Sequence, residues 1–104
     1  MIIISYWELN PDLDPTVIGE AAQMLMTKKI YPVAGVKEIA FYVSTSDYWG
    51  ITIEEAENEE QMAKGSMMWR LAKPGYIRVM KTTPAMDATK IIPLVMKLKK
   101  EIKG

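Results

Sequence analysis

The side chains best suited to hold a ligand are Arg78, Glu54, Tyr42 and Tyr48, which fall on three extended segments of the chain. The planar guanidinium of Arg78 suits an anionic or carbonyl-bearing ligand, because its fork of donors matches such acceptor groups. The hydroxyls of Tyr42 and Tyr48 would add hydrogen bonds in the same space. A second interpretation is equally open: Glu54, on the same predicted sheet face, could neutralise Arg78 in an internal ion pair.

Missing residue types limit the chemistry further. The chain has no cysteine and no histidine, which removes disulfides, thiol nucleophiles, thiolate metal sites and the commonest general base. The usual axial ligand of haem is absent as well. A metal site would need oxygen ligands, and no loop carries acidic residues at alternate positions for calcium. We therefore expect no haem, no tightly bound transition metal and no other cofactor.

Trp69 and the methionines admit two interpretations. Trp69 follows Met62 by seven residues on the apolar stripe of a predicted helix, where it either packs in the core or lines a pocket at the sheet edge. Nine methionines are many for 104 residues, and methionine serves both as an adaptable core residue and at pliable apolar binding surfaces. The predicted ligand-binding residues are Tyr42, Tyr48, Glu54, Trp69 and Arg78.

Strands and helices must bring these residues together. Runs of β-branched and aromatic residues between turn signals predict strands, and apolar residues at helical spacing predict helices. The predicted strands are 2–9, 36–44, 48–56 and 76–82, and the predicted helices are 15–28, 58–72 and 87–102. This βαββαβ order with an added helix is the split βαβ arrangement of the ferredoxin-like fold. We expect one α+β domain over residues 1–104, with a four-stranded antiparallel sheet and a C-terminal helix.

Local signals support the helix boundaries. Asp14 before Pro15 predicts the start of the first helix, and Asn58 with Gln61 resembles a capping box. Pro93 lies inside the last helix and predicts a kink or a division into two pieces.

The alternation of residues along the strands predicts which side chains face the helices: Ile39, Phe41, Val43, Trp49, Ile51, Ile53, Ile77 and Val79. The opposite face then mixes tyrosines and Met80 with a few charges, including Arg78 and Glu54. An open antiparallel sheet normally shows water a polar face. We therefore expect a second sheet, or the last helix, to cover this face, and predict a homodimer formed through the sheets.

Net charge and the distribution of apolar residues limit the kinds of partner that the protein can bind. Thirteen basic and thirteen acidic residues give no net charge, and the lysines gather only in the last helix, so we expect no binding to DNA or RNA. The apolar run from Met1 to Ile4 is interrupted by Ser5 and Glu8 and lacks the basic start of a signal peptide. We expect a cytoplasmic protein without membrane association.

Four short motifs follow one another along the chain: Trp7-Glu8-Leu9-Asn10-Pro11, Gly35-Val36-Lys37, Gly50 with the alternating Ile51-Thr52-Ile53-Glu54, and Trp69. In this order, over roughly residues 1–82, they resemble a small domain-of-unknown-function family in the dimeric α/β-barrel superfamily. The resemblance implies two ferredoxin-like sheets that close on each other. Members of the family often carry Arg-Trp-His where this chain has Phe41-Tyr42-Val43, which implies a different ligand or a lost site.

Several functions fit such a fold. The first hypothesis is a non-enzymatic dimer that encloses a small aromatic or carboxylate ligand, or a sensing or interaction module. The resemblance implies a second, a cofactor-free monooxygenase or small isomerase that activates an electron-rich substrate. Haem-degrading relatives supply a third, against which the missing histidine counts. We prefer the first, because the sequence offers a pocket without a recognisable nucleophile and base.

Overall fold

The computed structural model describes residues 1–104 and contains seven elements in the predicted order. The strands are β1 (Ile2–Leu9), β2 (Lys37–Val43), β3 (Trp49–Glu55) and β4 (Ile77–Ala85); the helices are α1 (Thr16–Thr27), α2 (Glu59–Ala72) and α3 (Ala88–Lys103). The predicted boundaries agree closely with these, except that β4 continues to Ala85, past its predicted end.

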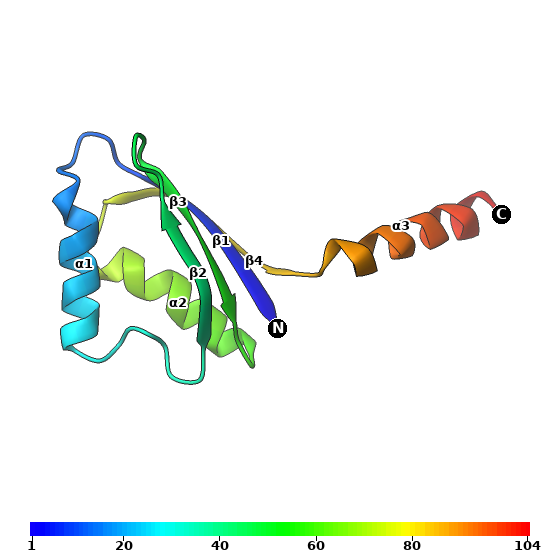
Figure 1. Cartoon of the computed structure of the whole chain (residues 1–104), viewed down its shortest axis with the longest axis horizontal. Helices are drawn as coiled ribbons and strands as arrows, with labels where there is room; N and C mark the ends of the chain where they lie inside the picture. Colours follow the sequence, from blue (N-terminus) through cyan, green and yellow to red (C-terminus); the bar gives the residue numbers. More distant parts are fainter.

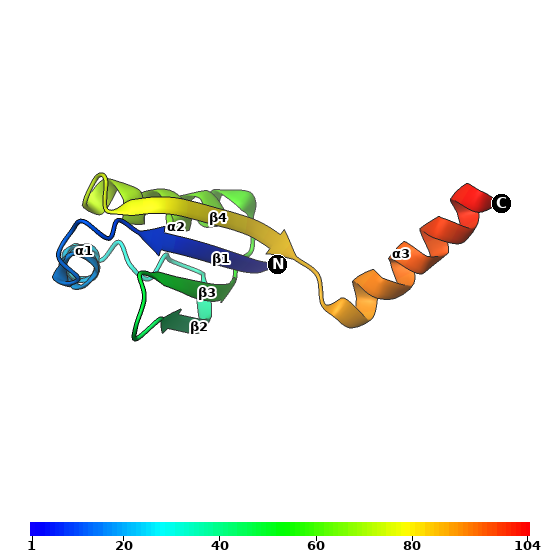
Figure 2. The same cartoon turned by 90° about the horizontal axis from the view of Figure 1, so that it is seen from above.

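The strands form one antiparallel sheet in the order β2-β3-β1-β4. Helices α1 and α2 lie on the same side of this sheet, and no helix packs against the opposite side (Figures 1 and 2). This confirms the predicted ferredoxin-like βαββαβ fold with an added C-terminal helix. Because β1 is central and pairs with both β3 and β4, its residues determine which way both neighbours face.

Local hydrogen bonds explain where two helices start. The carboxylate of Asp14 accepts a hydrogen bond from the backbone N–H of Thr16 at 2.9 Å, ahead of α1. At α2, Oδ1 of Asn58 accepts from the backbone N–H of Gln61 at 2.9 Å. The side chain of Gln61 in return accepts from the N–H of Glu57 at 2.7 Å. The predicted cap of α2 is therefore confirmed, although the side chain of Gln61 bonds to the backbone of Glu57, one residue before the capping Asn58.

The hydrophobic core lies between the sheet and the helices α1 and α2. Its buried residues are Trp7, Leu9, Ala21, Leu25, Val33, Met68, Trp69 and Tyr76. Phe41 meets Trp7 and Trp69 edge to face, with ring centroids 6.1 and 5.9 Å apart. Such pairs stabilise a core by about 0.5–1.5 kcal/mol each beyond the burial of their area. Trp69 is thus on the buried side of α2, as its helical spacing predicts.

The facing of β3 is opposite to the prediction. Thr52 pairs with Ser5 and Gly50 pairs with Trp7, and these side chains of β1 are buried toward the helices. The residues that the alternation pattern wrongly places toward the helices lie on the outer face instead: Trp49, Ile51, Ile53 and Val79. β1 carries apolar residues on both faces, whereas β3 turns its small and polar residues Gly50, Thr52 and Glu54 toward the helices, so hydrophobicity alone indicated the wrong face for β3.

Gly50 provides space for the indole of Trp7. A Cβ atom at this position would lie 2.3 Å from two carbons of the Trp7 ring and 2.6 Å from the carbonyl oxygen of Tyr42. Neither distance is compatible with a side chain at residue 50 unless the core rearranges. The buried polar and small residues of β3 therefore face the helices because Trp7 requires them there.

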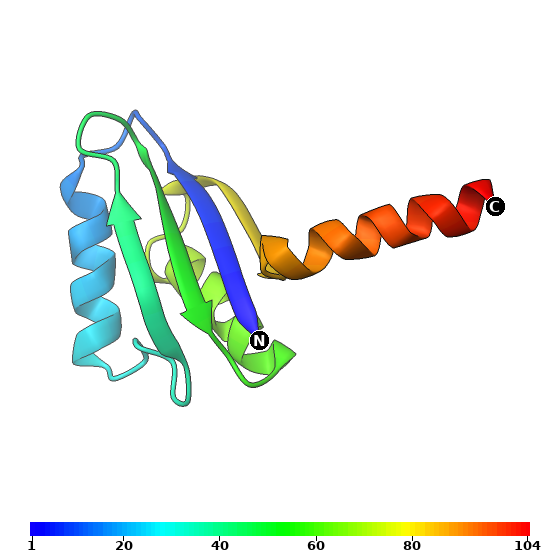
Figure 3. The same ribbon diagram turned by 45° about the vertical axis from the view of Figure 1, so that its right-hand side comes forward.

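Helix α3 stands apart from the domain. None of its residues is buried, and it projects beyond the end of β4 (Figures 1 and 3). It does not cover the outer face of the sheet, and Pro93 does not divide it, because proline in the second turn removes one intrahelical hydrogen bond without ending the helix. No helix of the protein has the length and apolar character needed to span a membrane.

Candidate functional site

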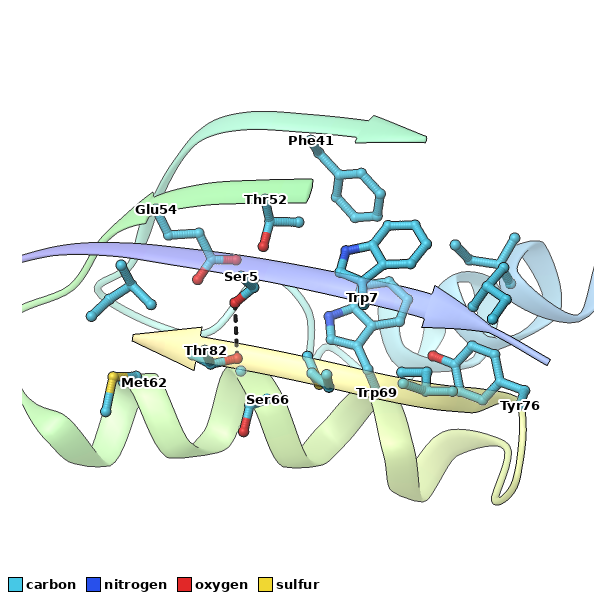
Figure 4. A pocket seen from close by; sticks show the side chains of 16 residues that line it. Ser5, Trp7, Phe41, Thr52, Glu54, Met62, Ser66, Trp69, Tyr76 and Thr82 are labelled. Carbon is cyan, nitrogen blue, oxygen red and sulfur yellow. Dashed lines mark hydrogen bonds between the residues drawn. The ribbon is translucent and has the colours of Figure 1, made fainter. Parts of the chain in front are cut away.

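A cavity lies between the helix-facing side of the sheet and α2 (Figure 4). Ten of its sixteen lining residues are hydrophobic. Its free volume is about 30 Å³, which holds one or two water molecules. A larger guest must displace side chains, and Met62 and Met80 in the wall are suited to this because methionine is unbranched and adapts its shape.

Aromatic rings form one end of the cavity. Trp7, Trp69 and Phe41 line it together with Tyr76 (Figure 4). Tyr31 supports this wall from behind, with its ring centroid 5.2 Å from that of Trp69. Because these rings come from β1, β2, α2 and the start of β4, the whole domain must fold before the wall exists.

Tyr76 carries a polar group without a partner. The residue is 2% exposed, and its hydroxyl makes no hydrogen bond within the chain. Burial raises the pKa of this phenol above its ordinary value, so it remains a neutral donor and acceptor. In Figure 4 the hydroxyl points toward the tryptophans at the aromatic end. Leaving such a group unpaired costs about 1–3 kcal/mol.

Hydroxyl groups and one carboxyl form the other end. The side chains of Ser5 and Thr82 hydrogen bond to each other at 3.0 Å across β1 and β4, next to the buried Thr52 (Figure 4). Glu54 extends into the same space from β3. A polar end and an aromatic end together make the mixed lining that is typical of small-molecule sites.

Glu54 is the only carboxyl group in the cavity wall, and no lysine or arginine lines the cavity. Its partner across the β2–β3 ladder is another acid, Glu38. Burial, and to a lesser extent the negative charge of Glu38, raise the pKa of Glu54 above its ordinary value. Glu54 is therefore suited to hold a proton, or to accept one, closer to neutral pH than an exposed glutamate.

The structure brings only two of the five predicted ligand-binding residues together. Glu54 and Trp69 both line the cavity. Tyr42 lies on the outer face and is 69% exposed. Tyr48 packs against the edge of the core without lining this cavity.

The predicted pairing of Arg78 with Glu54 is wrong. The guanidinium of Arg78 donates to the carboxylate of Glu8 at 3.0 Å on the outer face. Arg78 is on the face that alternation predicts, but Glu54 pairs with the buried Ile3 and faces the helices, so the two side chains lie on opposite sides of the sheet. The hydroxyl of Tyr6 also donates to Glu8, at 2.8 Å, and these two donors lower the pKa of Glu8.

Comparison with models of known protein families and with curated proteins returned no match. The structure holds no group of three or more acidic, cysteine or histidine residues that could bind a metal ion. A functional assignment therefore rests on the chemistry of the cavity and of the exposed surfaces.

Five polar residues of the cavity escaped the sequence analysis as site candidates: Ser5, Thr52, Ser66, Tyr76 and Thr82. The available signal was a polar residue at alternate positions of strands that are otherwise β-branched or aromatic, as in Ile4-Ser5-Tyr6. That pattern is also typical of a solvent-facing strand surface. Without knowing which side chains of β1 point toward the helices, a cavity lining could not be distinguished from a solvent-facing surface.

Proposed function

We propose that the protein is a non-enzymatic binding or sensing module that takes a small, mainly apolar molecule into the cavity beside α2. The unpaired hydroxyl of Tyr76 carries this proposal, because a ligand with one hydrogen-bonding group would satisfy it. The aromatic wall would supply apolar contact, and Met62 and Met80 would move to admit the ring.

The lining favours an uncharged aromatic ligand over a carboxylate. No basic side chain lines the cavity, and Glu54 would repel an anion whenever it is ionised. Its raised pKa increases the fraction of protonated carboxyl, which can donate to a carbonyl or hydroxyl oxygen. Of the two ligand classes predicted from the sequence, the aromatic class is the one that the cavity supports.

Binding can be measured through the intrinsic fluorescence of Trp7 and Trp69 during titration with p-cresol and 2-naphthol, with benzoate as the charged comparison. Tyr76→Phe should weaken binding of the phenols about 5–10-fold, the loss of one hydrogen bond. Tyr42→Phe removes the same hydroxyl outside the cavity and should leave affinity unchanged. Equal affinities for wild type and Tyr76→Phe, or no binding of either phenol, would contradict the proposal.

Glu54 supports a second candidate, a small isomerase. A half-buried carboxylate with a raised pKa can remove a proton from the carbon next to a carbonyl group and return it to a different carbon of the same molecule. This transfer leaves no net change in electrons and needs no co-reactant. Solvent deuterium exchange into a bound enone or ketone, lost in Glu54→Gln, would favour the isomerase over the binding module.

We further propose that the protein forms a homodimer through the outer face of its sheet. This face exposes Ile2, Ile4 and Trp49 to water at 37–40% of their surface. A stable sheet-to-sheet interface of this kind buries on the order of 2,000 Å². Light scattering at micromolar concentration should give twice the chain mass of 11.8 kDa. Ile4→Lys should produce monomers, whereas Met26→Lys, on the exposed side of α1, should not. We also propose that the protein is located in the cytoplasm.

A further inference from the structure

Helix α3 presents an apolar stripe that no other part of the chain covers. Ile91, Val95, Leu98 and Ile102 recur at spacings of four, three and four residues, so they lie along one side of the helix. All four are exposed, and Ile102 is 81% exposed. Helices in proteins gain most of their stability from packing such a stripe against another apolar surface.

The link to the domain directs α3 away from it. Only Met86 and Asp87 separate β4 from α3, and Asp87 caps the helix by accepting from the backbone N–H of Thr89 at 2.8 Å. With so short a link, α3 projects on the side of the sheet away from α1 and α2 (Figures 1 and 3). The stripe is therefore exposed along its length, and the outer sheet face is uncovered on the side toward which α3 projects.

The net charge of α3 distinguishes two surfaces of a second copy on which it could pack: the α3 helix of that copy and the rest of its chain. Five lysines and one glutamate give α3 a net charge of +4, whereas the rest of the chain, with eight basic and twelve acidic residues, carries −4. Two α3 helices packed together would bring +4 against +4. One α3 packed on the domain of another copy would bring +4 against −4, which favours association.

We propose that α3 is an exchanged arm, which lays its apolar stripe on the domain, residues 1–87, of a second copy of this chain. The inference rests on the proposed homodimer. Sixteen residues make a helix about 24 Å long, and four strands spaced about 4.8 Å apart are narrower than this, so the arm can extend past the edge of two packed sheets and reach the rest of the second copy. By two-fold symmetry each copy gives one arm and receives one, so the exchange adds buried apolar area twice.

The absence of cysteine makes a contact experiment possible. Lys99→Cys places one thiol at the margin of the stripe, where a benzophenone maleimide can be attached and photo-activated. In dimers mixed from ¹⁵N-labelled and unlabelled chains, cross-links should join residue 99 of one copy to residues 1–87 of the other. Cross-links confined to one copy, or joining the two α3 helices, would overturn the exchanged arm.

A matched pair of variants tests the energetics. Leu98→Gln lies on the stripe and should raise the dimer dissociation constant about tenfold, because it removes one buried leucine from each arm. Met96→Gln makes a similar change off the stripe and should have little effect. A wild-type monomer would refute the homodimer itself, whereas a dimer indifferent to Leu98→Gln would leave the homodimer standing and overturn the arm. Binding of the wild-type chain to vesicles of phosphatidylcholine and phosphatidylserine, lost in Leu98→Gln, would assign the stripe to a lipid surface and also overturn it.

Discussion

Among the glycine-to-alanine substitutions in this protein, Gly50→Ala should lower the free energy of unfolding the most. The new Cβ would lie 2.3 Å from two ring carbons of Trp7 and 2.6 Å from the carbonyl oxygen of Tyr42. Ordinary contacts lie at 3.4–4 Å, so both Trp7, which is buried, and the β2 backbone must move. Overpacking of a core costs about 1–3 kcal/mol. Because the Tyr42 contact is with backbone, we expect the upper end, about 3 kcal/mol.

Urea denaturation followed by circular dichroism measures this loss directly. Gly19→Ala is the control, since a Cβ there meets nothing within 4 Å and alanine in a helix should raise the free energy of unfolding by about 0.5–1 kcal/mol. Trp7→Phe removes the two contacted ring carbons, so Gly50→Ala should cost less in that background. A loss below about 0.5 kcal/mol in the wild-type background would show that Trp7 does not lie across β3 as described.

Three further predictions concern buried and capping groups. The pKa of Glu54 is raised in the folded state. The free energy of unfolding of the wild type should therefore fall relative to that of Glu54→Gln as pH rises from about 4, the ordinary glutamate pKa, toward the folded pKa. Urea denaturation of both proteins between about pH 4 and 8 measures this, and a difference that does not change with pH would contradict it. Asn58→Ala should lower the free energy of unfolding by about 1 kcal/mol through loss of the α2 cap, whereas Ser46→Ala in the β2–β3 loop should change it little. Tyr76→Phe should leave thermal stability unchanged or raise it by up to about 1 kcal/mol, because the hydroxyl has no partner to lose; a clear decrease would mean that it has one.

The fold was predictable because its local signals agree with one another. Asp14, Asn58 and the apolar spacing of each helix all indicate the same boundaries, and alternation identifies the strands. The burial of Trp69 followed from its place on the apolar stripe of α2. These features depend on neighbours within a few residues, which a sequence displays directly.

The site was only partly predictable because it depends on pairings between distant residues. The facing of β3 is determined by Gly50 opposite Trp7, and the apolar residues on the outer face of β3 favour the opposite assignment when the strand is considered alone. Val79 and Met80 were assigned to the wrong faces because a bulge next to Glu8 breaks the two-residue alternation of β4. The expected pairing of Arg78 with Glu54 failed because Glu54 follows the facing of β3 toward the helices. The outward course of α3 follows from the two residues that join it to β4, and no periodicity in the helix encodes it.

The central position of β1 has a consequence for the order in which the protein can form during synthesis. β1 is made first, yet it pairs with β4, from Ile2 opposite Ala85 to Leu9 opposite Ile77. Until the ribosome has released residue 85, one edge of this apolar strand has no partner, and the sheet cannot close around it. Long-range pairing of this kind slows folding and leaves aggregation-prone strand edges exposed to other chains. A nascent chain halted before β4 should therefore bind chaperones through Ile2, Ile3 and Ile4, and release them once β4 is complete.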